Sequence, residues 1–202
     1  MADLLIELFS EEIPASLQEQ GAKNLKNLIT NGLVSAGLTY SSAAAFHTPR
    51  RLTLAVEGLL EASPTVQEER KGPKVGVPDQ AIQGFLRSVG LAMDDLEIRD
   101  DKKGQVYFAK ITKPSRFAIQ IVAEVLEATI HNFPWPKSMR WGSGSLRWVR
   151  PLQSILCLLS NETETQIVPV EIGGLLAGNT TRGHRFMADD VFIVSNFNDY
   201  ET

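Results

Sequence analysis

The segment from residue 118 to residue 130 constrains the fold most, because apolar residues recur along it with the period of an α-helix. The residues on the repeating side are Ala118, Ile121, Val122, Val125, Leu126, Thr129 and Ile130. This spacing is typical of a helix that turns one side towards a protein core. Ser115 is its expected N-cap. Pro134 and Pro136 end the helix, because the residue before a proline avoids helical backbone angles.

Two earlier segments also predict amphipathic helices. The first opens at Pro14, whose ring suits a first helical turn, and ends before Gly37. Its expected apolar side contains Leu17, Leu25, Leu28, Ile29 and Leu33. The second follows Asp79, its expected N-cap, and stops at Gly90. Its apolar side contains Ile82, Phe85, Leu86 and Val89.

Short apolar or alternating runs between these helices predict β-strands. They cover residues 4–9, 43–47, 52–60, 96–99, 106–112, 154–159, 166–172 and 191–194. Residues 71–78 are expected to form a loop because they are rich in Gly and Pro. The pattern predicts an α+β fold, with a mainly antiparallel sheet and helices packed on one face.

Two domain arrangements are compatible with this order of elements. Residues 1–202 either form one interleaved domain or two lobes with a soft boundary near residue 134, where helical sequence gives way to strands. Residues 196–202 resemble the first turn of a helix, which indicates a domain that continues beyond this sequence.

Composition excludes a uniformly basic nucleic-acid-binding protein. Hydrophobic residues make up 43% of the 202 residues and the formal net charge is −4, so any RNA contact must come from a local basic patch. Cys157 is the single cysteine and lies in an apolar run, which predicts a buried, unreactive thiol. The first residues lack the pattern of a signal peptide. No apolar run approaches the roughly 20 residues that span a bilayer, so we expect a cytoplasmic protein.

The sequence contains few signs of catalytic chemistry. His47, His131 and His184 are far apart and have no metal-ligand spacing, so no metal site is expected. No phosphate-binding loop and no Gly-x-Ser-x-Gly motif is present. Glu11 and Glu12 are adjacent carboxylates, but they stand just before a helix, where they favour the positive end of its dipole.

Basic residues gather instead around turns late in the chain. Between residues 134 and 186 there are six Lys or Arg against three Glu. Planar guanidinium groups suit phosphate, and nearby aromatic rings can stack on unpaired bases. The candidate RNA-contacting residues are Arg50, Arg51, Lys137, Arg140, Arg147, Arg150, Arg182, His184 and Arg185. Trp135, Trp141 and Trp148 can instead be core anchors, and Trp148, next to Val149, favours that interpretation. Arg140 and Arg150 can equally pair with the acids near Glu11.

Six short motifs in the same order resemble the bacterial glycyl-tRNA synthetase beta subunit. They occupy residues 5–14, 48–52, 71–73, 137–142, 149–151 and 182–187. The resemblance implies a heterotetrameric class II ligase that attaches glycine to its tRNA. It implies that ATP, with magnesium, is used at the alpha subunit, and that the beta subunit chiefly recognises tRNA. The HD-type and anticodon-binding domains of the family lie outside this sequence.

The resemblance therefore predicts an amino-terminal module with no catalytic residues and no cofactor of its own. Its expected partners are the glycine-specific tRNA, the alpha subunit and the remainder of the beta subunit, and no membrane. Two alternatives remain open. One is a hydrolytic editing domain that uses His184 as a base, or a water activated beside Glu11. The other is a purely structural scaffold for the alpha subunit, with the arginines locked in ion pairs.

Overall fold

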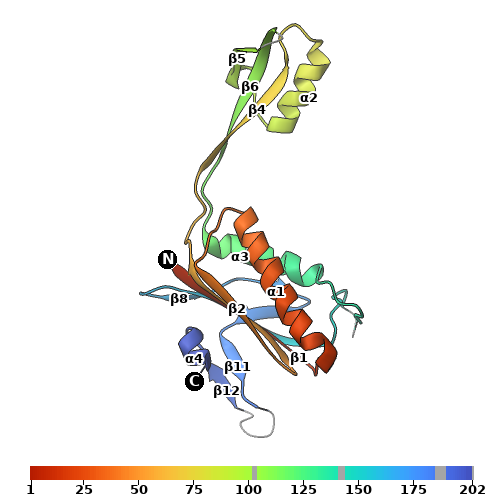
Figure 1. Cartoon of the computed structure of the whole chain (residues 1–202), viewed down its shortest axis with the longest axis vertical. Helices are drawn as coiled ribbons and strands as arrows, with labels where there is room; N and C mark the ends of the chain where they lie inside the picture. The colour runs from red at the N-terminus through yellow and green to blue at the C-terminus, as the bar shows by residue number, and fades with distance from the viewer. Residues whose placement is uncertain (102–103, 141–143, 185–189, 202) are drawn as a thin grey trace. The chain divides into compact units, whose positions relative to one another are not determined.

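The computed structural model describes residues 1–101, 104–140, 144–184 and 190–201. It divides into two compact units (Figure 1). The larger unit combines Met1–Ser63 with Arg116–Thr202, and the smaller unit is the insertion Pro64–Ser115. The division does not fall near residue 134, which lies inside the larger unit. The helical segment before that residue and the strands after it share one core, so the change in local structure there marks no boundary.

The larger unit is built on one sheet in the order β2-β3-β1-β7-β10-β9, with β8 also paired to β7. Its strands are β1 (Ala2–Ser10), β2 (Ser42–Thr48), β3 (Arg51–Leu59), β7 (Leu152–Ser160), β8 (Thr165–Ile167), β9 (Glu171–Ile172) and β10 (Leu175–Gly178). β1 lies between β3 and β7 and is antiparallel to both, so that Leu5 is opposite Ala55 and Leu158. β10 runs parallel to β7. The predicted α+β class with a mainly antiparallel sheet is confirmed.

Two long helices cover one face of this sheet, α1 (Ala15–Ser35) and α3 (Ala118–His131) (Figure 1). The side chains of Leu4, Ile6 and Leu8 on β1 join the core beneath them. The predicted helical period of α3 is confirmed, since its buried residues are Ala118, Ile121, Val122, Leu126, Thr129 and Ile130. On α1 the prediction was wrong for Leu28, which is exposed, because its position turns away from the sheet.

The opposite face of the sheet is also covered. It carries the hairpin of β11 (Thr180–Arg182) and β12 (Val191–Ile193), and the short helix α4 (Phe197–Glu201). Leu5 on β1 packs there with Leu156, Leu158 and Val194, and with Phe197 and Tyr200 of α4. Because both faces are covered, β1 is buried almost throughout. The mainly apolar sequence of this strand, in which Glu7 is the buried exception, follows from that double coverage.

The two long helices approach each other closely at Gly32. A Cβ atom at this position would lie 2.6 Å from Cγ1 of Val125 on α3. Glycine therefore sets the distance between α1 and α3 by leaving room for the valine. None of the helices within the described ranges is long and apolar enough to cross a membrane.

The smaller unit is a three-stranded antiparallel sheet with one helix. The strand order is β4-β6-β5. Its elements are β4 (Val66–Lys74), α2 (Asp79–Val89), the single turn η1 (Met93–Asp95), β5 (Leu96–Asp101) and β6 (Gly104–Lys113). Ile82 and Leu86 of α2 bury their side chains with Tyr107 of β6. The strands predicted over residues 96–99 and 106–112 are found as β5 and β6, which pair antiparallel as a hairpin.

The prediction of a loop over residues 71–78 was wrong for its first half, because β4 continues to Lys74. Its pairing with β6 shifts register between Lys71 and Lys74, where Pro73 lies. Proline lacks an N–H to donate and is tolerated on an edge strand at a bulge. Gly72 is also required there, since a Cβ atom would lie 2.6 Å from the Phe85 ring.

Other local predictions were corrected by the structure. Pro78 and Phe117 occupy the N-cap positions of α2 and α3, with no side-chain cap, in place of the expected Asp79 and Ser115. The strand expected over residues 166–172 is split into β8 and β9. Pro169 lies between the two pieces and removes a backbone donor from the ladder. The strands β10 and β11, of four and three residues, were not predicted.

Candidate nucleic-acid interface

A groove on the larger unit brings together three of the predicted cations, Lys137, Arg147 and Arg150. The start of α1 forms one side of it, and the connection from α3 to β7 forms the other. The groove has a volume of about 780 Å³. Its remaining lining residues are Pro14, Ser16, Leu17, Trp135, Pro136, Ser138, Met139 and Val149.

A short antiparallel bridge explains why cations that are distant in sequence meet here. The Met139 N–H donates to the Trp148 carbonyl oxygen at 2.9 Å, and the Trp148 N–H donates to the Met139 carbonyl oxygen at 3.3 Å. Lys137 lies two residues before Met139, and Arg147 and Arg150 flank Trp148. The bridge between Met139 and Trp148 therefore brings these cations onto neighbouring backbone segments. Arg140, next to the bridge, is exposed but does not line the groove.

The floor of the groove is anchored by an aromatic cluster. Trp148 is fully buried, and its ring centroid lies 4.7 Å from that of Phe133 and 5.3 Å from that of Trp135. The interpretation of Trp148 as a core anchor is confirmed. Trp135 is partly exposed and lines the groove, while its ring packs on Gly21, where a Cβ atom would lie 2.7 Å away. The cluster thus contributes Trp148 to the core and Trp135 to the lining of the groove.

Among the residues that the structure describes, the cations of the groove are not neutralised by neighbouring carboxylates. Within the described ranges, no carboxylate forms an ion pair with Lys137, Arg147 or Arg150. Arg150 donates one hydrogen bond, at 3.1 Å, to the carbonyl oxygen of Val149. The expected alternative, in which Arg140 and Arg150 pair with acids near Glu11, is not found among the described residues. The groove therefore presents positive charge to solvent.

Arg50 and Arg51 differ, because both side chains are engaged within the protein. Arg51 Nε lies 3.0 Å from a carboxylate oxygen of Glu7, a side chain that is 1% exposed. Arg50 Nε donates to the Ser10 carbonyl oxygen at 3.2 Å, and its Nη2 lies 3.8 Å from Glu11. Both guanidinium groups also lie over the Phe9 ring, at 4.6 and 5.0 Å from its centroid. These two residues are therefore weaker candidates for an RNA contact than the cations of the groove.

The last group of candidates lies at the end of β11. Arg182 is exposed and, in the part of the chain that the structure describes, has no carboxylate partner. His184 lines a pocket of about 180 Å³ with Glu12, Pro49 and Gly183. Arg185 and Trp141, which also figured in the prediction, lie outside the described residues.

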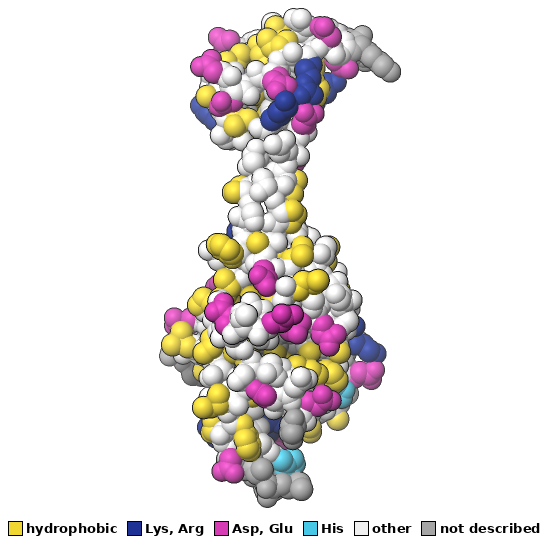
Figure 2. Space-filling model, turned by 90° about the vertical axis from the view of Figure 1, so that its left-hand side faces the viewer, with side chains coloured by type: hydrophobic (Ala, Val, Ile, Leu, Met, Phe, Trp, Pro, Cys, Tyr) yellow, Lys and Arg dark blue, Asp and Glu magenta, His cyan; other side chains and the backbone are white. Residues whose placement is uncertain are grey.

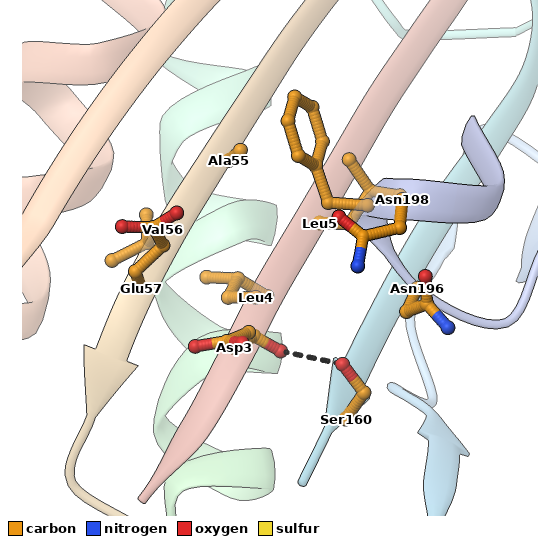
Figure 3. Close-up of a pocket in the computed structure, with 10 residues that line it drawn as sticks. Asp3, Leu4, Leu5, Ala55, Val56, Glu57, Ser160, Asn196 and Asn198 are labelled. Carbon is orange, nitrogen blue, oxygen red and sulfur yellow. Dashed lines mark hydrogen bonds between the residues drawn. The ribbon is translucent and has the colours of Figure 1, made fainter. Parts of the chain in front are cut away.

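A further pocket is too small and too acidic for RNA. Figure 3 shows Asp3, Glu57, Ser160, Asn196 and Asn198 around a space of about 90 Å³ beside α4. Asp3 accepts a hydrogen bond from the Gly58 N–H at 2.9 Å, and Glu57 accepts one from the Ser42 hydroxyl at 2.6 Å. Its carboxylates already have donors, and their charge repels phosphate. Figure 2 shows that acidic side chains also predominate over basic ones on one face of the larger unit.

Comparison with known proteins decides the family. The sequence profile described as glycyl-tRNA synthetase beta subunit matches residues 4–202. This chain belongs to the glycyl-tRNA synthetase beta subunit family. The match runs through both units and includes the groove and the β11 turn.

Named relatives support the assignment to the glycyl-tRNA synthetase beta subunit family. The chain is 67% identical over 200 residues to the glycine–tRNA ligase beta subunit of Paracoccus denitrificans and 66% identical over 200 residues to that of Ruegeria sp. strain TM1040, each alignment covering 99% of this chain. It is 60% identical over its full length to that of Dinoroseobacter shibae. The chain spans only about 29% of the length of the first two relatives.

One residue important to this region was missed in the sequence. Glu7 is the acidic residue inside the apolar run of β1, and this exception to the pattern was the available signal. Its carboxylate accepts hydrogen bonds from Thr181 Oγ1 at 2.8 and 2.9 Å and from the Tyr200 hydroxyl at 2.6 Å, in addition to its ion pair with Arg51. A buried charge with several donors joins segments that no sequence pattern connects.

Proposed function

We propose that this chain is a tRNA-contacting region of the beta subunit of glycine–tRNA ligase and that it has no adenylation site of its own. Lys137, Arg147 and Arg150 of the groove, with Arg182 at the end of β11, contact phosphates of the glycine-specific tRNA. The observation that carries the proposal is the groove of three cations without an ion-paired carboxylate among the described residues. In an acidic chain, such a local group favours a polyanionic ligand.

The proposal extends to the assembly in which the chain works. The ligase is cytoplasmic and heterotetrameric. It attaches glycine to tRNA with ATP, and with magnesium, at the alpha subunit. The alpha subunit and the remainder of the beta subunit are therefore partners of this chain. This region positions the tRNA, and the attachment of glycine takes place at the alpha subunit. The shortage of catalytic motifs in this sequence agrees with that division.

The test is tRNA binding by the full-length beta subunit at several potassium chloride concentrations. A Lys137→Ala/Arg147→Ala variant loses two phosphate contacts. The slope of log K against log salt then falls by roughly 1.4–1.8, since each contact accounts for about 0.7–0.9. Lys74→Ala/Arg87→Ala is the matched control. Both of these cations are exposed on the smaller unit, and neither has an ion pair within the described ranges. A slope that is unchanged in the first variant, or equally reduced in both, contradicts the proposal.

A further inference from the structure

The carboxylate of Glu7 stands at the centre of a buried polar cluster that joins four elements. Glu7 lies on β1 and is 1% exposed. Arg51 reaches it from β3, Thr181 from β11 and Tyr200 from α4. Thr53 of β3 joins the group through the Tyr200 hydroxyl. We call these five residues the Glu7 cluster. A carboxylate withdrawn from water is tolerated only when charge and hydrogen bonds compensate it. The cluster therefore fastens β11 and α4 to the sheet.

The protons of the cluster have a definite arrangement. Burial, and then the charge of Glu7, raise the pKa of Tyr200, so its hydroxyl stays protonated and donates to the carboxylate at 2.6 Å. The Thr53 hydroxyl lies 2.8 Å from the same phenol oxygen and is left to donate to it. Thr181 Oγ1 donates to both oxygens of Glu7. Tyr200 and Thr181 thus donate to the Glu7 carboxylate, which in turn holds the Arg51 guanidinium.

The other end of the Arg51 guanidinium holds the backbone of the β11 turn. Its Nη2 donates to the Arg182 carbonyl oxygen, and lies 3.3 Å from the Gly183 carbonyl oxygen as a second acceptor. The Gly183 N–H donates to the Asp190 carbonyl oxygen at 3.0 Å. A guanidinium is a planar fork with donors on different edges, so it can bind a carboxylate and a backbone carbonyl at once. The single ammonium of lysine cannot do both in the same geometry.

We propose that Arg51 is a positioning residue that acts on tRNA binding through Arg182. Glu7 holds the guanidinium, the guanidinium holds the carbonyl groups of Arg182 and Gly183, and the exposed Arg182 side chain is thereby presented to a phosphate. This inference rests on the proposed function only in taking Arg182 as the phosphate contact. Arg51 itself touches no phosphate in this arrangement, although its type and neighbourhood in the sequence favour such a contact.

A double-mutant cycle in the full-length beta subunit tests the inference. Arg182→Ala, Arg51→Met and the double variant are compared by binding of glycine-specific tRNA at several salt concentrations. Arg182→Ala lowers the salt slope by about 0.7–0.9. Arg51→Met lowers the salt slope by up to the same amount. The double variant binds tRNA no more weakly, and with no lower slope, than Arg182→Ala alone. An additional loss of slope when Arg51 is replaced in the Arg182→Ala background shows a direct phosphate contact and overturns the inference.

Two further variants separate positioning from folding and from the proposed function. Arg51→Lys keeps a positive charge beside Glu7 but cannot hold both carbonyl groups. It remains folded, with faster amide hydrogen exchange over residues 180–184 and the same binding deficit as Arg51→Met. Lys74→Ala removes an exposed cation of the smaller unit, outside the Glu7 cluster, and it leaves the salt slope unchanged. If Arg182→Ala does not alter binding, the proposed contact of this turn fails, and hydrogen exchange in Arg51→Lys still decides the positioning role. Unchanged exchange over residues 180–184 overturns it.

Discussion

Gly32 offers a quantitative test of how the larger unit is packed. An alanine there would place a Cβ atom 2.6 Å from Cγ1 of Val125, whereas ordinary contacts lie at 3.4–4 Å. Either α1 or α3 must move, because valine is stiff about its Cα–Cβ bond. Overpacking of this kind costs about 1–3 kcal/mol. The better helix propensity of alanine offsets roughly 0.5–1 kcal/mol of that cost. Gly32→Ala is therefore expected to destabilise the larger unit by about 1 kcal/mol.

The assay is differential scanning calorimetry on the chain. For a unit of this size, a loss of about 1 kcal/mol lowers Tm by roughly 2–4 °C. The matched control is Gly84→Ala in α2, where nothing lies within 4 Å of the added Cβ atom. That substitution raises the stability of the smaller unit by about 0.5–1 kcal/mol, because only the helix propensity changes.

A second substitution identifies the contact responsible. Val125→Ala removes the methyl groups that the new Cβ atom would meet, so the Gly32→Ala/Val125→Ala variant should be more stable than the sum of the single effects predicts. The expected coupling is about 1 kcal/mol. If Gly32→Ala is as stable as the parent, or if the coupling is absent, then α1 and α3 do not pack at this distance and the reasoning fails.

Three other predictions concern the buried Glu7 carboxylate, the buried Cys157 thiol and the editing alternative. Glu7→Gln should destabilise the larger unit by about 3 kcal/mol, measured by urea unfolding, because it leaves the Arg51 guanidinium without its counter-ion. An unchanged midpoint would contradict the role of the Glu7 cluster. Burial raises the pKa of the Cys157 thiol above its ordinary value of 9.0. The native thiol should therefore resist a disulfide reagent at pH 8 and react fully in urea, and its contribution to stability should decline as the pH rises above about 9. Alanyl-tRNA of the glycine isoacceptor should be deacylated no faster with the chain than in buffer, whereas rapid hydrolysis abolished by His184→Ala would support editing.

Local patterns were sufficient for most of the secondary structure. The period of the segment that became α3 and the apolar run of β1 each identified an element, because helix and strand periods depend on near neighbours in sequence. The end of β4 was missed for the converse reason. Gly72 and Pro73 have the composition of a loop, yet pairing with β6 and contact with the Phe85 ring hold them in an edge strand.

The sequence could predict which residue types form the candidate site, but not which of the cations are paired with a carboxylate. Sequence indicated which arginines and lysines gather near turns, and the structure places Lys137, Arg147 and Arg150 around one groove. Sequence could not distinguish these from Arg51, which has the same chemistry and a similar turn context. The difference arises from Glu7, a residue on another strand.

The amino-acid sequence by itself determined the positions of the main helices and strands and the burial of Cys157, because each depends on the local pattern of apolar residues. It also determined the family of the chain, because six short motifs occur along it in the family's order. Only the tertiary structure decided that Pro64–Ser115 is an insertion between two parts of one core. It also decided which cations remain available to a ligand. Neutralisation of a charge depends on distances of a few ångströms, and strand pairing between remote segments sets those distances.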